Sequence, residues 1–152
     1  MIIDDRSGLS GCRPILFVES VARSIDYYVG ALGFRLGWAW CDNEQRFLEP
    51  SDEAVPTFAL VARGLVQLML AQKGQGAPGM WLHLDVHTAE HVDTLCEEWT
   101  RTGANILAAP SLRPWGMYEM RVCDLDNHVL RVSAPPPKSS EADAPPDTGR
   151  GR

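Results

Sequence analysis

A few charged side chains stand inside otherwise apolar segments, and these are the residues whose types could do chemistry. His83 and Asp85 alternate with leucines in MWLHLDV, so both would project from one face of a strand. Such a pair, or His83 with Glu119, could perform acid–base catalysis without a metal. The simpler interpretation of His83 is a strand residue whose ring has a satisfied hydrogen bond, and we assign no catalytic residue.

Two arginines, Arg13 and Arg131, also lie in short apolar segments. Guanidinium groups bind carboxylates and phosphates through two parallel hydrogen bonds, so this pair could hold an anionic group of a ligand. Alternatively, the arginines could pair with Asp85 or Glu119 for structural reasons, because a buried guanidinium requires a partner. The sequence leaves both alternatives open.

The sequence was also searched for motifs of enzymes that use a nucleophile or a nucleotide. The chain has no G-x-S-x-G nucleophile motif and no P-loop. Its four cysteines (Cys12, Cys41, Cys96 and Cys123) are widely separated, without a C-x-x-C pair. We therefore expect neither disulfides nor a catalytic thiol.

The candidate residues lie on strands of a unit that occurs twice. In the first unit, strands are expected at residues 13–18, 34–40, 57–62 and 65–71. Ser20 can accept a backbone hydrogen bond and so begin a helix between the first two strands, which Gly33 would end.

The second unit repeats this order. Strands are expected at residues 80–86, 105–108, 117–122 and 129–132, with a helix that Thr88 begins and Gly103 ends. The order predicts an α+β domain of two tandem βαβββ modules, residues 13–71 and 80–133. We expect them to form a curved, partly closed mixed sheet around a cavity.

The two ends of the chain differ from this domain in composition. Residues 1–12 are expected to be an extension, and residues 134–152, rich in proline, to be disordered. The N-terminus lacks the basic-then-apolar order of a signal peptide, and no apolar run approaches the ~20 residues of a membrane helix. The net charge of −6 argues against nucleic acid as a partner and mildly favours a cationic ligand. We expect a cytoplasmic protein.

Three stretches carry a resemblance to a known superfamily. SIDYYVGALGF resembles the family helix S-x-x-F-Y-x-x-x-L-G-F, GLVQLMLA resembles the strand that closes its first half, and RPWGMYEMRVCDLDNHVLRV resembles its C-terminal hairpin. The chain is thereby identified as similar to glyoxalase, bleomycin resistance and dioxygenase proteins, also called vicinal oxygen chelate proteins. In the usual turn D-P-D-G, Leu125 and Asn127 replace the proline and glycine; asparagine tolerates the left-handed backbone required there.

The resemblance also implies where metal ligands would lie. Metal-dependent members place a His, Glu or Gln at four strand positions, which correspond here to Arg13, Met69, Trp81 and Arg131. Arginine has no acceptor, tryptophan is not a ligand, and a thioether is a poor ligand for hard metals. We therefore expect no metal and no cofactor. A register slip of two residues would make His83 a ligand but would leave both arginines in place.

The cavity-facing residues suggest the kind of ligand. They are Arg13, Ile15, Phe17, Trp38 or its neighbour Trp40, Gln67, Met69, Trp81, His83 and Arg131. This lining suits a planar or amphipathic organic molecule, cationic ones included. By resemblance Trp115 lies near the binding groove, where it could stack on a ligand or pin its loop to the sheet.

These expectations favour a metal-independent binding protein of the bleomycin-resistance type, which sequesters a small organic molecule. The resemblance further implies a homodimer with ligand grooves at the subunit interface. The alternative is a metal-dependent lyase, isomerase or dioxygenase of the same superfamily.

Overall fold

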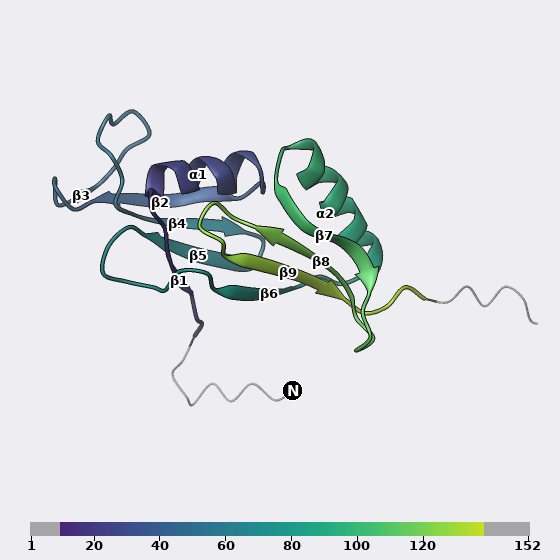
Figure 1. Ribbon diagram of the computed structural model, residues 1–152. Helices are drawn as coiled ribbons and strands as arrows, with labels where there is room; N and C mark the ends of the chain where they lie inside the picture. The colour runs from purple at the N-terminus through teal and green to yellow at the C-terminus, as the bar shows by residue number, and fades with distance from the viewer. Residues whose placement is uncertain (1–9, 139–152) are drawn as a thin grey trace, which may run out of the picture.

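The computed structural model describes residues 10–138 and contains two modules (Figure 1). The first consists of β1 (Ile15–Phe17), α1 (Val21–Gly30), β2 (Arg35–Cys41), β3 (Arg46–Phe47), β4 (Phe58–Arg63) and β5 (Val66–Ala71). The second consists of β6 (Trp81–Asp85), α2 (Ala89–Arg101), β7 (Asn105–Leu112), β8 (Tyr118–Cys123) and β9 (Val129–Ala134). The predicted α+β fold of two modules is confirmed. Most of the N-terminal extension and of the proline-rich tail lies outside the described residues.

Each module builds its own sheet. The first-module sheet has the order β1-β5-β4-β2-β3 and the second-module sheet the order β6-β9-β8-β7. In both, the opening strand pairs in parallel with the closing strand, and the other pairs are antiparallel. The two sheets are curved but do not close on each other. The short strand β3 was not predicted, and β7 runs four residues further than expected, through two register shifts.

The helices begin where the sequence predicts. The hydroxyl groups of Ser20 and Thr88 each accept a hydrogen bond from the backbone N–H three residues later. Gly33 and Gly103, which follow the helices, have positive φ angles of 69° and 86°. No helix within residues 10–138 is both long and apolar enough to cross a membrane.

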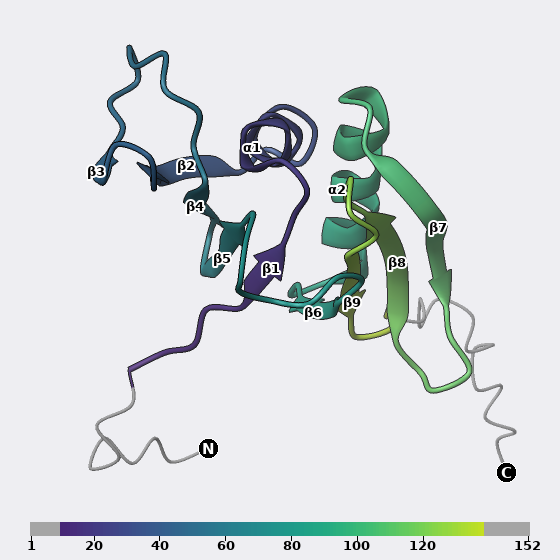
Figure 2. The ribbon, with the colours of Figure 1, turned by 60° about the vertical axis from the view of Figure 1, so that its left-hand side comes forward.

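Each helix covers one face of its own sheet, and the two covered faces are turned toward the middle of the molecule (Figure 2). The core there is continuous. Leu16, Leu68 and Leu70 of the first-module sheet belong to the same buried cluster as Leu130 and Val132 of the second-module sheet. The opposite face of each sheet, called its outer face below, is consequently directed away from the core.

The β8–β9 turn (residues 124–128) ties the modules together. The buried Tyr28 of α1 donates its hydroxyl proton to Oδ2 of Asp124, at 2.9 Å. The fully buried His128 accepts the Met80 N–H at Nδ1, so its Nε2 carries the proton and donates to the Phe17 carbonyl at 2.6 Å. The turn therefore contacts α1, β1 and the start of β6 at once. Asn127 has a φ of 64° in this turn, as the sequence led us to expect.

The segment between β5 and β6 lies against the first strand. Ala77 forms a parallel bridge with Leu16, and Gly76 has a φ of 76°. A Cβ atom at Gly76 would lie 2.5 Å from the Ile15 carbonyl oxygen. This close approach of two backbones requires glycine.

The Tyr28–Asp124 hydrogen bond gives a stability prediction. Burial raises the pKa of Tyr28 well above its ordinary value, and Asp124 raises it further, so the phenol remains a donor. Tyr28→Phe keeps the ring but leaves a buried carboxylate oxygen without this donor. The free energy of unfolding should fall by about 1–3 kcal/mol in urea denaturation.

Tyr118→Phe is the matched control, because Tyr118 donates to Asp93 at the exposed surface. It should change the stability by less than about 0.5 kcal/mol. Equal losses for the two variants would show that the Tyr28 hydrogen bond does not hold the modules together.

Candidate functional site

The outer face of the first-module sheet carries two cross-strand rows of large side chains. Strand register places Ile15, Met69, Leu60 and Trp38 in one row, and Phe17, Ala71, Phe58 and Trp40 in the next. Apart from Ala71, which is buried, all are only half-buried. The face is therefore apolar and incompletely covered within one chain.

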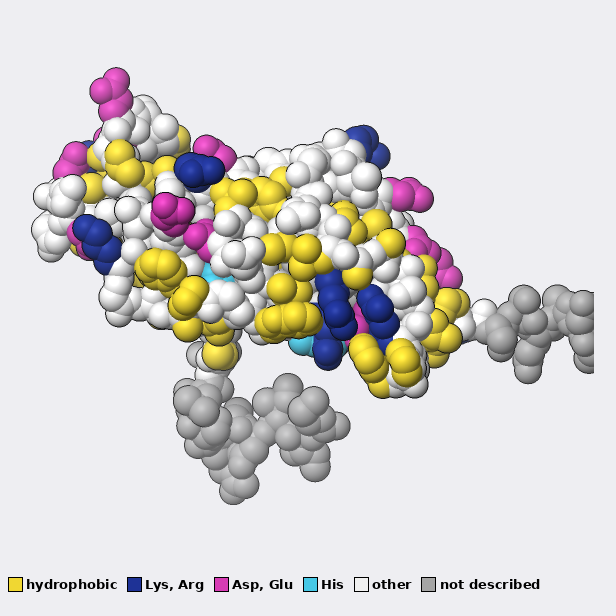
Figure 3. Space-filling model, in the orientation of Figure 1, with side chains coloured by type: hydrophobic (Ala, Val, Ile, Leu, Met, Phe, Trp, Pro, Cys, Tyr) yellow, Lys and Arg dark blue, Asp and Glu magenta, His cyan; other side chains and the backbone are white. Residues whose placement is uncertain are grey.

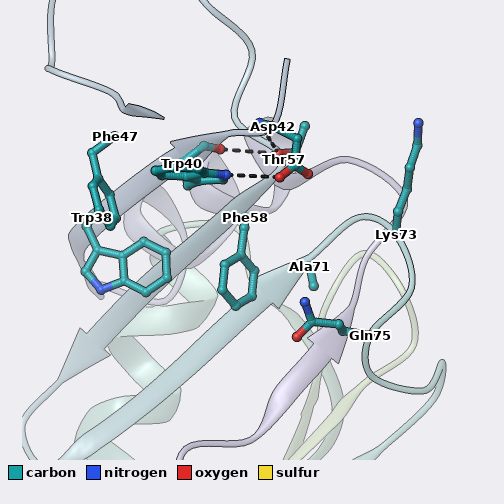
Figure 4. Close-up of a pocket in the computed structure, with 9 residues that line it drawn as sticks. All are labelled: Trp38, Trp40, Asp42, Phe47, Thr57, Phe58, Ala71, Lys73 and Gln75. Carbon is teal, nitrogen blue, oxygen red and sulfur yellow. Dashed lines mark hydrogen bonds between the residues drawn. The ribbon is translucent and has the colours of Figure 1, made fainter. Parts of the chain in front are cut away.

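An aromatic pocket of about 350 Å³ opens at the Trp40 end of these rows (Figure 4). Its lining residues are Trp38, Trp40, Asp42, Phe47, Thr57, Phe58, Ala71, Lys73 and Gln75. The Phe47 ring lies edge-on to Trp40 and Trp38, with centroid distances of 5.0 and 5.7 Å, and Phe58 lies 5.2 Å from Trp38. Ala71 is the small residue between these larger ones, and it leaves room for a flat molecule beside the rings.

Polar groups fix one end of the aromatic pocket. The Asp42 carboxylate accepts hydrogen bonds from Trp40 Nε1 at 3.0 Å and from the Thr57 hydroxyl at 2.9 Å. These bonds hold the Trp40 ring, whereas the Lys73 side chain points away from the rings (Figure 4). A carboxylate beside aromatic faces favours a planar cation.

The outer face of the second-module sheet is polar. The Arg131 guanidinium donates to His83 Nδ1 from Nε and Nη2, at 3.1 and 3.0 Å, and His83 Nε2 lies 3.0 Å from an Asp85 carboxylate oxygen. Because Nδ1 accepts, Nε2 carries the proton and the imidazole is neutral. Arg121 lies over the Trp81 ring, 5.2 Å from its centroid.

A buried carboxylate stands in the middle of this second face. Glu119 is fully buried, and its Oε2 accepts from Trp115 Nε1 at 2.9 Å and from the Ser133 hydroxyl at 3.3 Å. Arg131 Nε lies 3.8 Å from the same oxygen. The indole of Trp115 thus ties its loop to the sheet, and more than half of that residue is still exposed.

The four positions implied as metal ligands divide into two pairs. Arg13 and Met69 belong to the first module, where Arg13 Nε donates to Gln67 Oε1. Trp81 and Arg131 lie on the outer face of the second module. Since the two outer faces point in different directions, one chain does not bring the four positions together. Within the described part of the chain, no three His, Cys, Asp or Glu side chains are grouped as metal ligands.

The other predicted site residues follow the same division. Phe17, Trp38, Trp40 and Met69 share the first outer face, and Trp81, His83, Trp115 and Arg131 share the second. Both tryptophans of β2 face outward, although the sequence was read as offering one or the other. Of the two predicted arginine partners, Glu119 is approached by Arg131, and within residues 10–138 neither Arg13 nor Arg131 pairs with Asp85.

Sequence reasoning missed several residues at these faces. Phe47 and Asp42 lie around the unpredicted strand β3, and Phe58 opens β4. Alternation in FALVAR would have placed Phe58 on the same face as Leu60.

The segment GQGAPG also has the G-x-G-x-x-G spacing, but it joins β5 to β6 and no helix follows it directly. It therefore lacks the strand–turn–helix context of a dinucleotide site.

Comparison with known proteins adds a family match and several structural neighbours. The model of the glyoxalase/bleomycin resistance protein/dioxygenase superfamily matches residues 12–132. No curated protein matches the sequence. A bleomycin-binding protein from bleomycin-producing Streptomyces verticillus, solved with copper(II)-bleomycin, is 22% identical with a TM-score of 0.60, over 84% of this chain and 98% of that one.

Two further neighbours have similar scores. A glyoxalase-related enzyme from Clostridium phytofermentans is 16% identical with a TM-score of 0.61, over 84% of this chain and 96% of that one. TioX from Micromonospora sp. ML1 is 21% identical with a TM-score of 0.60, over 83% of this chain and 100% of that one. At such identities, these likenesses show the fold alone.

The Trp115–Glu119 contact gives a second stability prediction. Trp115→Phe keeps an aromatic ring but removes a donor from a buried carboxylate, so unfolding should require about 1–3 kcal/mol less free energy. Trp81→Phe is the control, because the Trp81 indole N–H forms no hydrogen bond within the described residues. It should stay within about 0.5 kcal/mol of wild type. If Trp115→Phe and Trp81→Phe lowered the stability equally, in both thermal and urea denaturation, Trp115 would not pin its loop to the sheet.

Proposed function

The chain belongs to the glyoxalase/bleomycin resistance protein/dioxygenase superfamily, and from that premise we propose that it binds a small organic molecule without a metal and without changing it. The ligand is planar or amphipathic, cationic molecules included. The observation that carries this proposal is the aromatic pocket formed by Trp38, Trp40, Phe47 and Phe58 beside the Asp42 carboxylate. Sequestration of this kind, in the cytoplasm, would give resistance to a toxic compound such as an antibiotic.

The residue types at the four ligand positions support a metal-independent role. Two guanidinium groups, an indole and a thioether supply no lone pairs suited to a hard divalent cation. Of the nearby groups with lone pairs, His83 Nδ1 already accepts from Arg131. Glu119 is held by Trp115 and Ser133. Their hydrogen bonds would have to break before either could bind a metal.

The pocket chemistry supports a flat ligand. Three edge-to-face aromatic contacts keep the rings at steep angles, so an inserted planar molecule can meet ring faces and edges together. The bleomycin-binding protein among the structural neighbours was solved with copper(II)-bleomycin, and this supports small-molecule binding as a role for such a fold. The ligand class proposed for our chain rests on its own side chains.

We further propose that two copies of the chain form the complete site. The apolar rows on the first outer face are only half-buried in one chain, and such a face favours association. A homodimer would cover it and could set the aromatic face of one copy opposite the polar face of the other.

Sedimentation equilibrium should give twice the single-chain mass of 16.8 kDa. A single-chain mass at the highest soluble concentration would contradict the dimer.

Calorimetry tests ligand binding directly. Bleomycin, quinoline and acridine serve as planar probes, and at least one should bind with saturable heat. Phe47→Ala should weaken that binding by about three- to tenfold, because Phe47 contributes one wall of the pocket. Phe47 is 59% exposed, so the variant should fold normally.

Leu65→Ala is the control, since Leu65 is fully exposed at the β4–β5 turn, outside the pocket. It should bind like wild type. No binding by any probe would count against sequestration. Stoichiometric zinc, nickel, manganese or iron in protein purified without chelator would instead favour a metal-dependent enzyme.

A further inference from the structure

We propose that Arg113, Arg121 and Arg131 form an oxyanion subsite on the outer face of the second module, which binds a carboxylate or phosphate group of the ligand. The inference rests on the proposed function, because the anionic group is taken to be part of the sequestered molecule. In the proposed dimer, the ligand would then need an anionic group for this subsite besides the planar body held by the aromatic pocket of the other copy.

Strand register places two of the three arginines side by side, and Arg113 stands just beyond the end of β7. Arg121 and Arg131 are direct cross-strand partners in β8 and β9, so their side chains leave the same face. Arg113 follows two residues after Ser111, which pairs with Glu119. The space-filling view shows dark blue Lys and Arg side chains gathered beside a cyan histidine over this sheet (Figure 3).

This arrangement has an excess of positive charge. Like charges placed directly opposite each other destabilise a sheet. Within the described residues, Arg131 is the one arginine of the three with a carboxylate within 4.0 Å, the buried Glu119, whereas Asp85 is largely exposed and contacts His83. The cluster is basic although the whole chain carries a charge of −6. An anion would relieve the repulsion between the arginines.

Several donors in the cluster have no acceptor. Nε and Nη2 of Arg113 and Nε of Arg121 are buried, and they have no hydrogen-bond partner within the described residues. The unpaired donors show that Arg113 and Arg121 lack a full set of partners within the described residues, so their positive charge is left for an anion at this face to balance. Guanidinium groups match the oxygen spacing of carboxylates and phosphates. The buried Oε1 of Glu119 is also without a hydrogen-bond partner in the described part of the chain.

The subsite is organised before a ligand arrives. The ring of Trp81 supports Arg121, and His83 accepts from two nitrogens of Arg131. Trp115 and Ser133 hold Glu119 next to Arg131. Groups that are already oriented lose less conformational freedom on binding.

Calorimetry with phenyl phosphate, benzoate and phenol tests the subsite, because these probes share a ring and differ in charge. At least one of the two anions should bind about tenfold more tightly than phenol, which corresponds to about 1.4 kcal/mol. The stronger of the two identifies phosphate or carboxylate as the preferred group. Arg121→Gln and Arg113→Gln should each remove most of this advantage.

Two further variants guard against trivial explanations. Arg121→Lys keeps the charge but loses the planar fork, so it should bind the anions at an intermediate strength and remain folded by circular dichroism. Arg101→Gln removes an exposed arginine from α2, which covers the opposite face of the sheet, and it should bind as wild type does. An equal loss in Arg101→Gln would show a diffuse charge effect and overturn the inference.

The outcomes separate the subsite from the proposed function. If phenyl phosphate, benzoate and phenol bind alike while the planar probes still bind, the subsite is wrong and the binding function stands. If the anions bind through Arg121 and Arg113 while no planar probe binds, the oxyanion subsite stands and the aromatic role of the first module is wrong.

Discussion

The constraint on which the structure depends is the contact made by the β8–β9 turn with the first module. Asp124 binds the Tyr28 hydroxyl of α1, and His128 bridges the Met80 amide and the Phe17 carbonyl. All of these partners are distant in sequence from the turn. Because a single short turn contacts both modules, the helices are fixed on the inside and both sheets present their other faces outward.

That orientation divides the chemistry of one chain between two surfaces. The first outer face is aromatic and carries the Asp42 carboxylate, whereas the second carries the cross-strand pair Arg121 and Arg131 and the buried Glu119. A molecule that used both would need a ring system and an anionic group. The division also explains why the positions aligned with metal ligands do not meet in one chain, whatever side chains occupy them. Assembly, rather than folding alone, would decide which groups face each other.

Local signals in the sequence were sufficient to predict most helices and strands, but not to predict which side chains meet on the outer faces of the sheets. Ser20 and Thr88 predicted both helix starts, because capping depends on neighbouring residues. The two-residue strand β3 escaped because so short a pairing leaves no periodic pattern. Arg113 and Arg121 were not recognised, since Arg121 meets Arg131 through the register of β8 with β9 and Arg113 lies just beyond β7. Such registers are set by contacts across the sheet, which alternation along one strand does not contain.

The close approach at Gly76 has a consequence for how this architecture could diversify. The connection between modules is held against the opening strand, at a backbone conformation and a spacing that exclude any side chain. That part of the connection is therefore joined to the first module and cannot act as a hinge without losing the contact. New ligand preferences would then arise most simply by exchanging side chains on the two outer faces, while this backbone contact stays the same.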